Sequence, residues 1–207
     1  MKSSSRLIYI HDPMCSWCYG FKPVLTSLSD ALKDKIEINY LLGGLAKDTD
    51  SAMPEIMQQQ IKENWRNIEQ TIPGIKFNYD FWSQCIPRRS TYASCRAVIA
   101  AKIQRLNAEL KMINTIQQAY YSNAQNPSDY SVLYSLATKI GLDIDQFKRD
   151  IHSDAVNNEL LNQISKCRII GASTFPSLYV SHNDDYYPIV LDYNNVDIII
   201  EHISSYI

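Results

Sequence analysis

Two cysteines three positions apart are the residues in this sequence with the clearest chemical potential. Cys15 and Cys18 enclose Ser16 and Trp17, and a helix is predicted to begin beside Cys15. The free N–H groups and partial positive charge of a helix N-terminus favour the thiolate form of a cysteine placed there. Cys15 is therefore expected to attack a substrate disulfide, and Cys18, one turn further on, is expected to resolve the mixed disulfide.

A cysteine pair with this spacing can also be half of a zinc site. Such a site needs a second pair of Cys or His ligands at close spacing. Cys85, Cys95 and Cys167 are single, and the four histidines form no such pair. We therefore expect no metal, and no cofactor other than a redox-active Cys15–Cys18 disulfide.

His11 and Asp12 precede the pair and are candidates for tuning the Cys15 thiol. A protonated His11 would favour the thiolate, whereas an ionised Asp12 would disfavour it. The other interpretation is that both residues only shape the turn, because Asp-Pro is a common turn pair.

Pro176, after Phe175 and before a predicted strand, is the second element of interest. A cis X–Pro bond costs only about 0.5–1 kcal/mol, and it would leave the Phe175 backbone free to pair with an extended substrate segment. The alternative is a trans proline that opens an edge strand; the cysteine pair elsewhere in the chain favours cis. Trp17 either contacts apolar substrate side chains or covers Cys18. The candidate substrate-binding residues are Trp17, Phe175 and Pro176.

The remaining cysteines have a simpler interpretation. Cys95 and Cys167 each lie on an apolar helical stripe, where a free cysteine behaves as a small buried hydrophobe. Cys85 precedes an Ile-Pro pair and is a candidate for an exposed thiol. A regulatory disulfide between Cys85 and Cys95 stays open, since sequence separation does not define the distance between them.

The elements that position the pair begin with a βαβ unit. Residues 6–10 form a short β-branched run, a helix is expected from about Cys15 to Lys33, and residues 36–42 read as a second strand. Strand, crossover helix and strand in this order give parallel strands.

The middle of the chain is predicted to be helical, because apolar residues recur at steps of three or four. Helices are also expected between Ser128 and Gly141, after Asp143, and after Ser153. The two longest apolar faces are Met53, Met57, Ile61, Trp65, Ile68 and Ile72, and then Cys95, Ile99, Ile103, Leu106, Leu110 and Ile113.

The end of the chain returns to strands. Residues 177–181 and 187–191 are expected to be joined by a polar turn at 183–185, and Pro188 places the second strand at a sheet edge. Residues 195–207 read as a closing helix.

The pattern is βαβ, a helical block, then ββα, which is an α/β thioredoxin-like fold with a large all-helical insertion. Because the two halves of one sheet lie at opposite ends of the sequence, we expect a discontinuous thioredoxin-like domain. It comprises residues 1–45 and 172–207, and residues 46–171 form the insertion.

The run from Tyr9 to Phe21, with Asp-Pro-Met-Cys-Ser-Trp-Cys at its centre, resembles the DsbA family of thiol–disulfide oxidoreductases and specifically its FrnE-like cytoplasmic branch. Segments 43–45, 95–97 and 171–178 agree, so the resemblance spans nearly the whole chain.

This resemblance implies dithiol–disulfide exchange on proteins or small thiols. It makes Cys15 the nucleophile, Cys18 the resolving thiol and Pro176 a cis-proline opposite them. The family often has glycine where Thr174 stands, so the loop before Pro176 is expected to be stiffer here.

Composition limits the partners. The net charge is −2, and Arg88-Arg89, read as a solvated turn, is an isolated basic pair, so neither nucleic acid nor an anionic membrane is expected. No run approaches the roughly 18–20 apolar residues of a membrane span. Residues 7–10 are too few for a signal-peptide core of about 7–15 residues, and we therefore expect a cytoplasmic protein.

The sequence thus predicts an enzyme, a cytoplasmic disulfide reductase or isomerase acting on protein or peptide disulfides or on glutathione-like thiols, with glutathione as a candidate reductant. Two alternatives stay open. One is a glutathione-dependent isomerase or transferase of small molecules, against which the retention of both Cys15 and Cys18 argues. The other is a non-enzymatic peptide-binding module.

Overall fold

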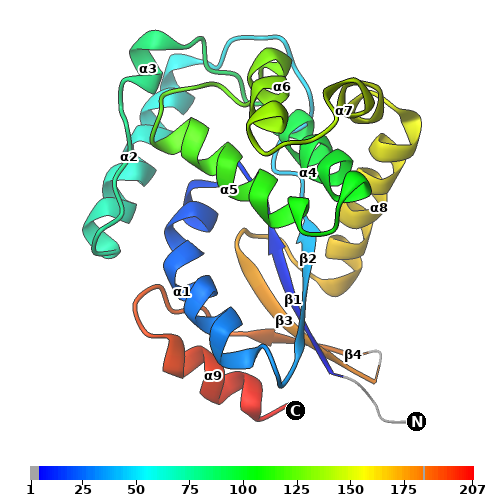
Figure 1. Cartoon of the computed structure of the whole chain (residues 1–207). Coiled ribbons are helices and arrows are strands. Elements are labelled where there is room, and N and C mark those ends of the chain that lie inside the picture. Colours follow the sequence, from blue (N-terminus) through cyan, green and yellow to red (C-terminus); the bar gives the residue numbers. More distant parts are fainter. Residues whose placement is uncertain (1–4, 184) are drawn as a thin grey trace.

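The computed structural model describes residues 5–183 and 185–207. The first four residues and Asp184, at the centre of the expected polar turn, lie outside the described residues. Four strands form one mixed sheet in the order β2-β1-β3-β4 (Figure 1). β1 (Arg6–His11) pairs in parallel with β2 (Glu37–Leu42). β3 (Ser177–His182) runs antiparallel to β1 on one side and to β4 (Asp185–Ile189) on the other.

Helices cover both faces of this sheet (Figure 1). Successive side chains of a strand point to opposite faces, and every residue of β1 after Arg6 is buried. Leu7 and Tyr9 pack beneath α1 (Ser16–Leu32) and α9 (Val196–Ser204). Ile8 and Ile10 pack beneath α8 (Asp154–Ile170) on the other face.

The chain between β2 and β3 forms a block of helices, coloured from cyan to yellow in Figure 1. Its core is rich in aromatic side chains around the fully buried Trp65, and it includes Met14 and Leu42 from the sheet half. Helices α2 to α7 span Glu55–Thr71, Phe81–Gln84, Tyr92–Gln104, Ala108–Tyr121, Tyr130–Lys139 and Ile144–Ile151. The α/β fold with a helical block between its two halves is therefore confirmed.

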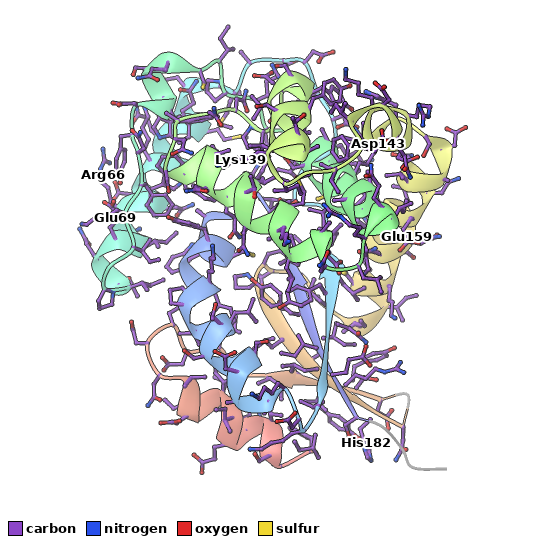
Figure 2. The ribbon with its side chains drawn as sticks, viewed as in Figure 1. Arg66, Glu69, Lys139, Asp143, Glu159 and His182 are labelled. Atoms are coloured by element: carbon purple, nitrogen blue, oxygen red, sulfur yellow. The ribbon has the colours of Figure 1, made fainter. Side chains whose placement is uncertain are left out.

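At two of the predicted helix N-termini the structure shows a side chain that caps the helix. The Asp143 side chain, labelled in Figure 2, accepts the Gln146 N–H, and the Ser153 hydroxyl accepts the Val156 N–H. These bonds satisfy donors that have no partner within the helix.

Two predictions of element position are wrong. The apolar spacing from Cys95 to Ile113 does not define one helix face, because α4 ends at Gln104 and α5 begins at Ala108. Helix α4 is buried on nearly every side, so its apolar residues mark no single stripe, and Ile103, Leu106 and Leu110 are exposed. The last strand also begins at Asp185, two residues earlier than expected.

No helix among the described residues combines the length and the apolar composition that a bilayer crossing needs.

Candidate active site

Cys15 is the residue from which α1 starts. Its backbone is extended (φ −83°, ψ 119°), and its carbonyl accepts the Tyr19 N–H at 3.0 Å. This is the geometry of an N-cap, so the unpaired N–H groups of the first turn lie beside the Cys15 side chain. The sequence prediction of a cysteine at the helix start is confirmed.

The two cysteines have different surroundings. Cys15 is 7% exposed and lines a cavity of about 440 Å³, whereas Cys18 is 1% exposed and does not line it. Burial raises the pKa of the Cys18 thiol well above its ordinary value, and its hydrogen bond with Cys15 adds to this. Cys18 is therefore protonated at neutral pH.

Phe175 and Pro176 lie against the first cysteine. The peptide bond between them is cis, as expected, and the Phe175 carbonyl accepts the Cys15 thiol at 3.4 Å. The prediction that the Phe175 backbone is free is therefore wrong for its carbonyl, which is paired with the Cys15 thiol. The Phe175 ring packs on the backbone of Gly43, where a Cβ would overlap it, so residue 43 has to be glycine for the ring to lie there.

The cavity beside Cys15 is closed by the helical block. Trp17, Phe175 and the loop around Thr174 form one wall, and the opposite wall comes from α2 and the end of α5. The α2 residues are Met57, Gln60, Ile61, Asn64 and Trp65. The expected apolar face of α2 therefore serves both as core and as cavity wall, a double use that periodicity alone does not reveal.

Arg89 is the charged residue among the described residues that line this cavity. The interpretation of Arg88-Arg89 as a solvated turn is wrong for both residues. Arg88 donates to Asp129, and Arg89 lies close enough to Tyr120 to oppose the rise that burial causes in the pKa of that phenol. A loop arginine gives no sequence signal of this kind, because its neighbours in space come from distant helices.

Asp12 is fully buried and joins three segments. Its carboxylate accepts the N–H groups of Met14 at 2.8 Å and Leu45 at 2.7 Å, the Thr91 hydroxyl at 2.7 Å and the Cys95 thiol at 3.5 Å. Burial raises the pKa of Asp12, and hydrogen bonds from these donors act in the opposite direction. Asp12 therefore does more than shape its own turn.

His11 carries no charge at neutral pH. It is 1% exposed, and its ring stacks on Tyr9 with centroids 5.1 Å apart. Burial lowers the pKa of His11 to about 3, so the protonated imidazole that would favour the Cys15 thiolate is not available. Within the described residues, neither ring nitrogen has a hydrogen-bond partner.

The other cysteines lie apart from this chemistry. Cys95 and Cys167 are buried, as expected, and Cys85 is half-buried and donates to the Ala124 carbonyl at 3.2 Å. The five cysteines are free thiols. Residues 5–183 and 185–207 contain no group of three or more His, Cys, Asp or Glu placed to hold a metal ion.

Comparison with known proteins identifies a family and relatives of this chain. The model of a family described as "Thioredoxin" matches residues 8–201. A "ClpXP adapter protein SpxH" from Halalkalibacterium halodurans is 26% identical over 178 residues, which cover 84% of this chain and 57% of that protein. The chain thus spans little more than half the length of this curated relative.

Two solved structures share the fold. A "putative protein disulfide isomerase" from Nitrosomonas europaea superposes with a TM-score of 0.86 at 24% identity, over 98% of this chain and 97% of that one. The cytosolic disulfide reductase DsbM from Pseudomonas aeruginosa gives a TM-score of 0.73 at 21% identity, over 90% and 89% of the two chains.

We predict that Asp12→Asn lowers the free energy of unfolding by about 2–3 kcal/mol, because an amide has one acceptor oxygen where the carboxylate has two, and buried donors lose their partner. Urea denaturation measures this loss. The control is Asp129→Asn, which removes a partly exposed carboxylate paired with Arg88 and should cost no more than about 1 kcal/mol. Equal losses in the two variants would contradict the role of Asp12.

A second prediction concerns acid stability. The unfolded imidazole binds a proton below its ordinary pKa of about 6.5, whereas His11 in the folded chain does so only near 3. The unfolded state therefore binds more protons between these values, and stability falls as the pH is lowered through them. His11→Phe keeps an aromatic ring on Tyr9 and should unfold less readily, relative to wild type, as the pH falls from about 6.5 to about 4. Denaturant titrations across this range test the sign; a difference independent of pH would refute it.

Proposed function

The chain belongs to the thioredoxin family, and from this premise we propose that it is a thiol–disulfide oxidoreductase that works through Cys15 and Cys18. The observation that carries the proposal is the unequal placement of the two sulfurs. One caps a helix beside a cavity, and the other is a buried thiol one turn further on. This arrangement supplies an accessible nucleophile and a resolving thiol kept in reserve.

The proposed reaction has two exchanges. The Cys15 thiolate attacks one sulfur of a substrate disulfide, which releases the first substrate thiol and leaves a mixed disulfide on Cys15. Cys18 then attacks the Cys15 sulfur and releases the second thiol. The substrate is reduced by two electrons, and the Cys15–Cys18 pair is oxidised to a disulfide that an external thiol such as glutathione reduces again.

We propose that the chain acts as a reductase or isomerase in the cytoplasm. The direction depends on the potential of the pair against that of its surroundings, and about 30 mV corresponds to about 1.4 kcal/mol for this two-electron couple. A reducing glutathione pool would hold a moderately oxidising pair mainly as the dithiol. Reduction of substrate disulfides is also the activity named for a cytosolic protein that shares this fold.

The cavity suggests two classes of substrate. Extended peptide disulfides can lie along the segment of Phe175 and Pro176, with apolar side chains against Trp17. The guanidinium of Arg89 would in addition bind a carboxylate, which favours small acidic thiols such as glutathione. The use of glutathione to isomerise or transfer other small molecules remains the less favoured alternative, because it does not require Cys18.

An adapter role is a second candidate, favoured by the name that the curated relative carries. Such a role would use the cavity and its aromatic walls to bind a protein partner without redox turnover. The single variant Cys15→Ser separates the two: an adapter keeps its affinity for ClpXP, whereas an oxidoreductase loses turnover.

We predict that Cys15→Ser abolishes the reduction of a model disulfide protein by glutathione, and that Cys18→Ser accumulates a mixed disulfide on Cys15. Insulin reduction and mass spectrometry of the trapped species measure the two effects. Cys85→Ser, which alters a half-buried thiol outside the cavity, should retain wild-type turnover. Undiminished turnover in Cys15→Ser would remove the proposal.

Arg89→Gln should raise KM for oxidised glutathione about three- to tenfold, because a charge-assisted bond to a partly exposed guanidinium is lost. KM for the uncharged hydroxyethyl disulfide should stay the same. The control is Arg66→Gln, which removes an exposed arginine of α2 that pairs with Glu63 outside the cavity and is labelled in Figure 2. An equal change for both disulfides would exclude carboxylate recognition by Arg89.

A further inference from the structure

Tyr121, the last residue of α5, lines the same cavity as Cys15. Its side chain is fully buried, and within the described residues its hydroxyl has no hydrogen-bond partner. A buried polar group without a partner is rare and calls for an explanation. The wall of the cavity therefore contains a hydroxyl that a hydrogen-bond acceptor bound beside Cys15 can satisfy.

Aromatic neighbours hold the Tyr121 ring in place. It stacks on Tyr19 with centroids 4.6 Å apart and meets Phe77 edge to face at 5.3 Å. The Tyr19 N–H donates to the Cys15 carbonyl, so this stack fixes the phenol relative to the first turn of α1. A polar group that is held by packing is preorganised, and it needs no rearrangement when charge develops beside it.

The Tyr121 hydroxyl is a hydrogen-bond donor close to the reactive sulfurs. Burial raises the pKa of this phenol well above its ordinary value, and the charges of Tyr120, Cys15 and Cys18 add to the rise. The phenol therefore keeps its proton at the pH of thiol exchange. The Cys15 thiol already donates to another partner, the Phe175 carbonyl, so the Tyr121 hydroxyl is available to an atom bonded to Cys15.

The two cysteines line different cavities. Cys18 lines a second cavity, of about 190 Å³, between α1, β1, β2 and α5, and Tyr121 does not line it. Tyr121 therefore stands on the side from which a substrate reaches Cys15. A substrate sulfur bonded to Cys15 extends into the first cavity, whose opposite wall includes Tyr121.

We propose that the Tyr121 hydroxyl is a catalytic group that donates a hydrogen bond to the substrate sulfur as that sulfur leaves Cys15. This inference rests on the proposed dithiol chemistry. During resolution, deprotonated Cys18 forms a bond to the Cys15 sulfur, and the bond between Cys15 and the substrate sulfur breaks. The electron pair of the broken bond goes to the substrate sulfur, which departs as a thiolate. The released thiolate takes up a proton from water, which balances the proton that Cys18 gave to water, and Tyr121 keeps its own proton throughout.

The other donors of the cavity wall are less suited to this task. Trp65 Nε1 is also buried without a partner, but the aromatic contacts of Trp65 are with residues of the helical block, whereas Tyr121 stacks on Tyr19 of α1. The remaining polar side chains of the wall are at least partly exposed, so water can satisfy their donors before and after the exchange: Gln60, Asn64 and Arg89.

The test varies the leaving thiol at constant charge. Hydroxyethyl disulfide releases an alkyl thiolate, which is a poor leaving group, and dipyridyl disulfide releases a good one; both reagents are uncharged at neutral pH. A thiol of lower pKa leaves faster without assistance, so the hydrogen bond from Tyr121 should matter most for the alkyl thiolate. Rapid acid quench of the full chain followed by mass spectrometry measures how fast the mixed disulfide on Cys15 decays.

Tyr121→Phe should slow the decay of the hydroxyethyl mixed disulfide about tenfold, which is within the range for the loss of a hydrogen bond to a charged group. The decay of the pyridyl mixed disulfide should slow less than about twofold. The matched control is Tyr79→Phe, because Tyr79 packs on Trp65 in the same aromatic cluster but donates to Glu69 and does not line the cavity. Both decay rates in this control should equal those of the wild-type chain.

Equal slowing of the two mixed disulfides in Tyr121→Phe would overturn the proposal, because a merely structural change does not discriminate between leaving groups. Two wild-type decay rates in Tyr121→Phe would overturn it as well, and so would a Tyr79→Phe variant that is slowed in the same selective way. If the wild-type chain formed no mixed disulfide on Cys15 with either reagent, the proposed function would fail, and this inference with it.

Discussion

The buried carboxylate of Asp12 is the interaction on which the geometry of this molecule depends. It accepts hydrogen bonds from the N–H of Met14, in the loop that carries Cys15, and from the N–H of Leu45, in the loop after β2. It also accepts a hydrogen bond from the hydroxyl of Thr91, directly before α4. A buried carboxylate is costly unless its lone pairs are satisfied. The carboxylate therefore ties the sheet half to the helical block three residues before the first cysteine.

The position of this junction separates the two sulfurs. Helix α1 begins where the sheet meets the helical block, so Cys15 opens toward the cavity between them, and Cys18, one turn later, lies beneath the first turn. Burial then keeps Cys18 protonated, whereas the first position has the unpaired N–H groups of the helix start. Two chemically identical side chains thereby acquire different tasks from their surroundings alone.

The sequence predicts those features of the structure that depend on residues close together in the chain. The cysteine spacing, the β-branched run that ends at Ile10 and the cap at Ser153 each indicate local geometry that the chain retains when folded. It does not predict what depends on contact between distant segments. Arg89 lines the cavity together with residues of α2 and α5, and the neutral state of His11 follows from its burial in the folded chain. The apolar pattern does not predict the break between α4 and α5, because a helix that is buried on nearly all sides has no single apolar stripe to mark its end.

Helix α5 borders both cavities, the first through Tyr120 and Tyr121 and the second through Asn114 and Gln117. Substitutions along this helix can therefore alter the walls of both cavities without any change in the strands or in the cysteines. The sheet half preserves the reactive geometry, while the helical block decides access to it. A shared fold need not carry a shared activity when the walls of the site come from helices outside the shared sheet.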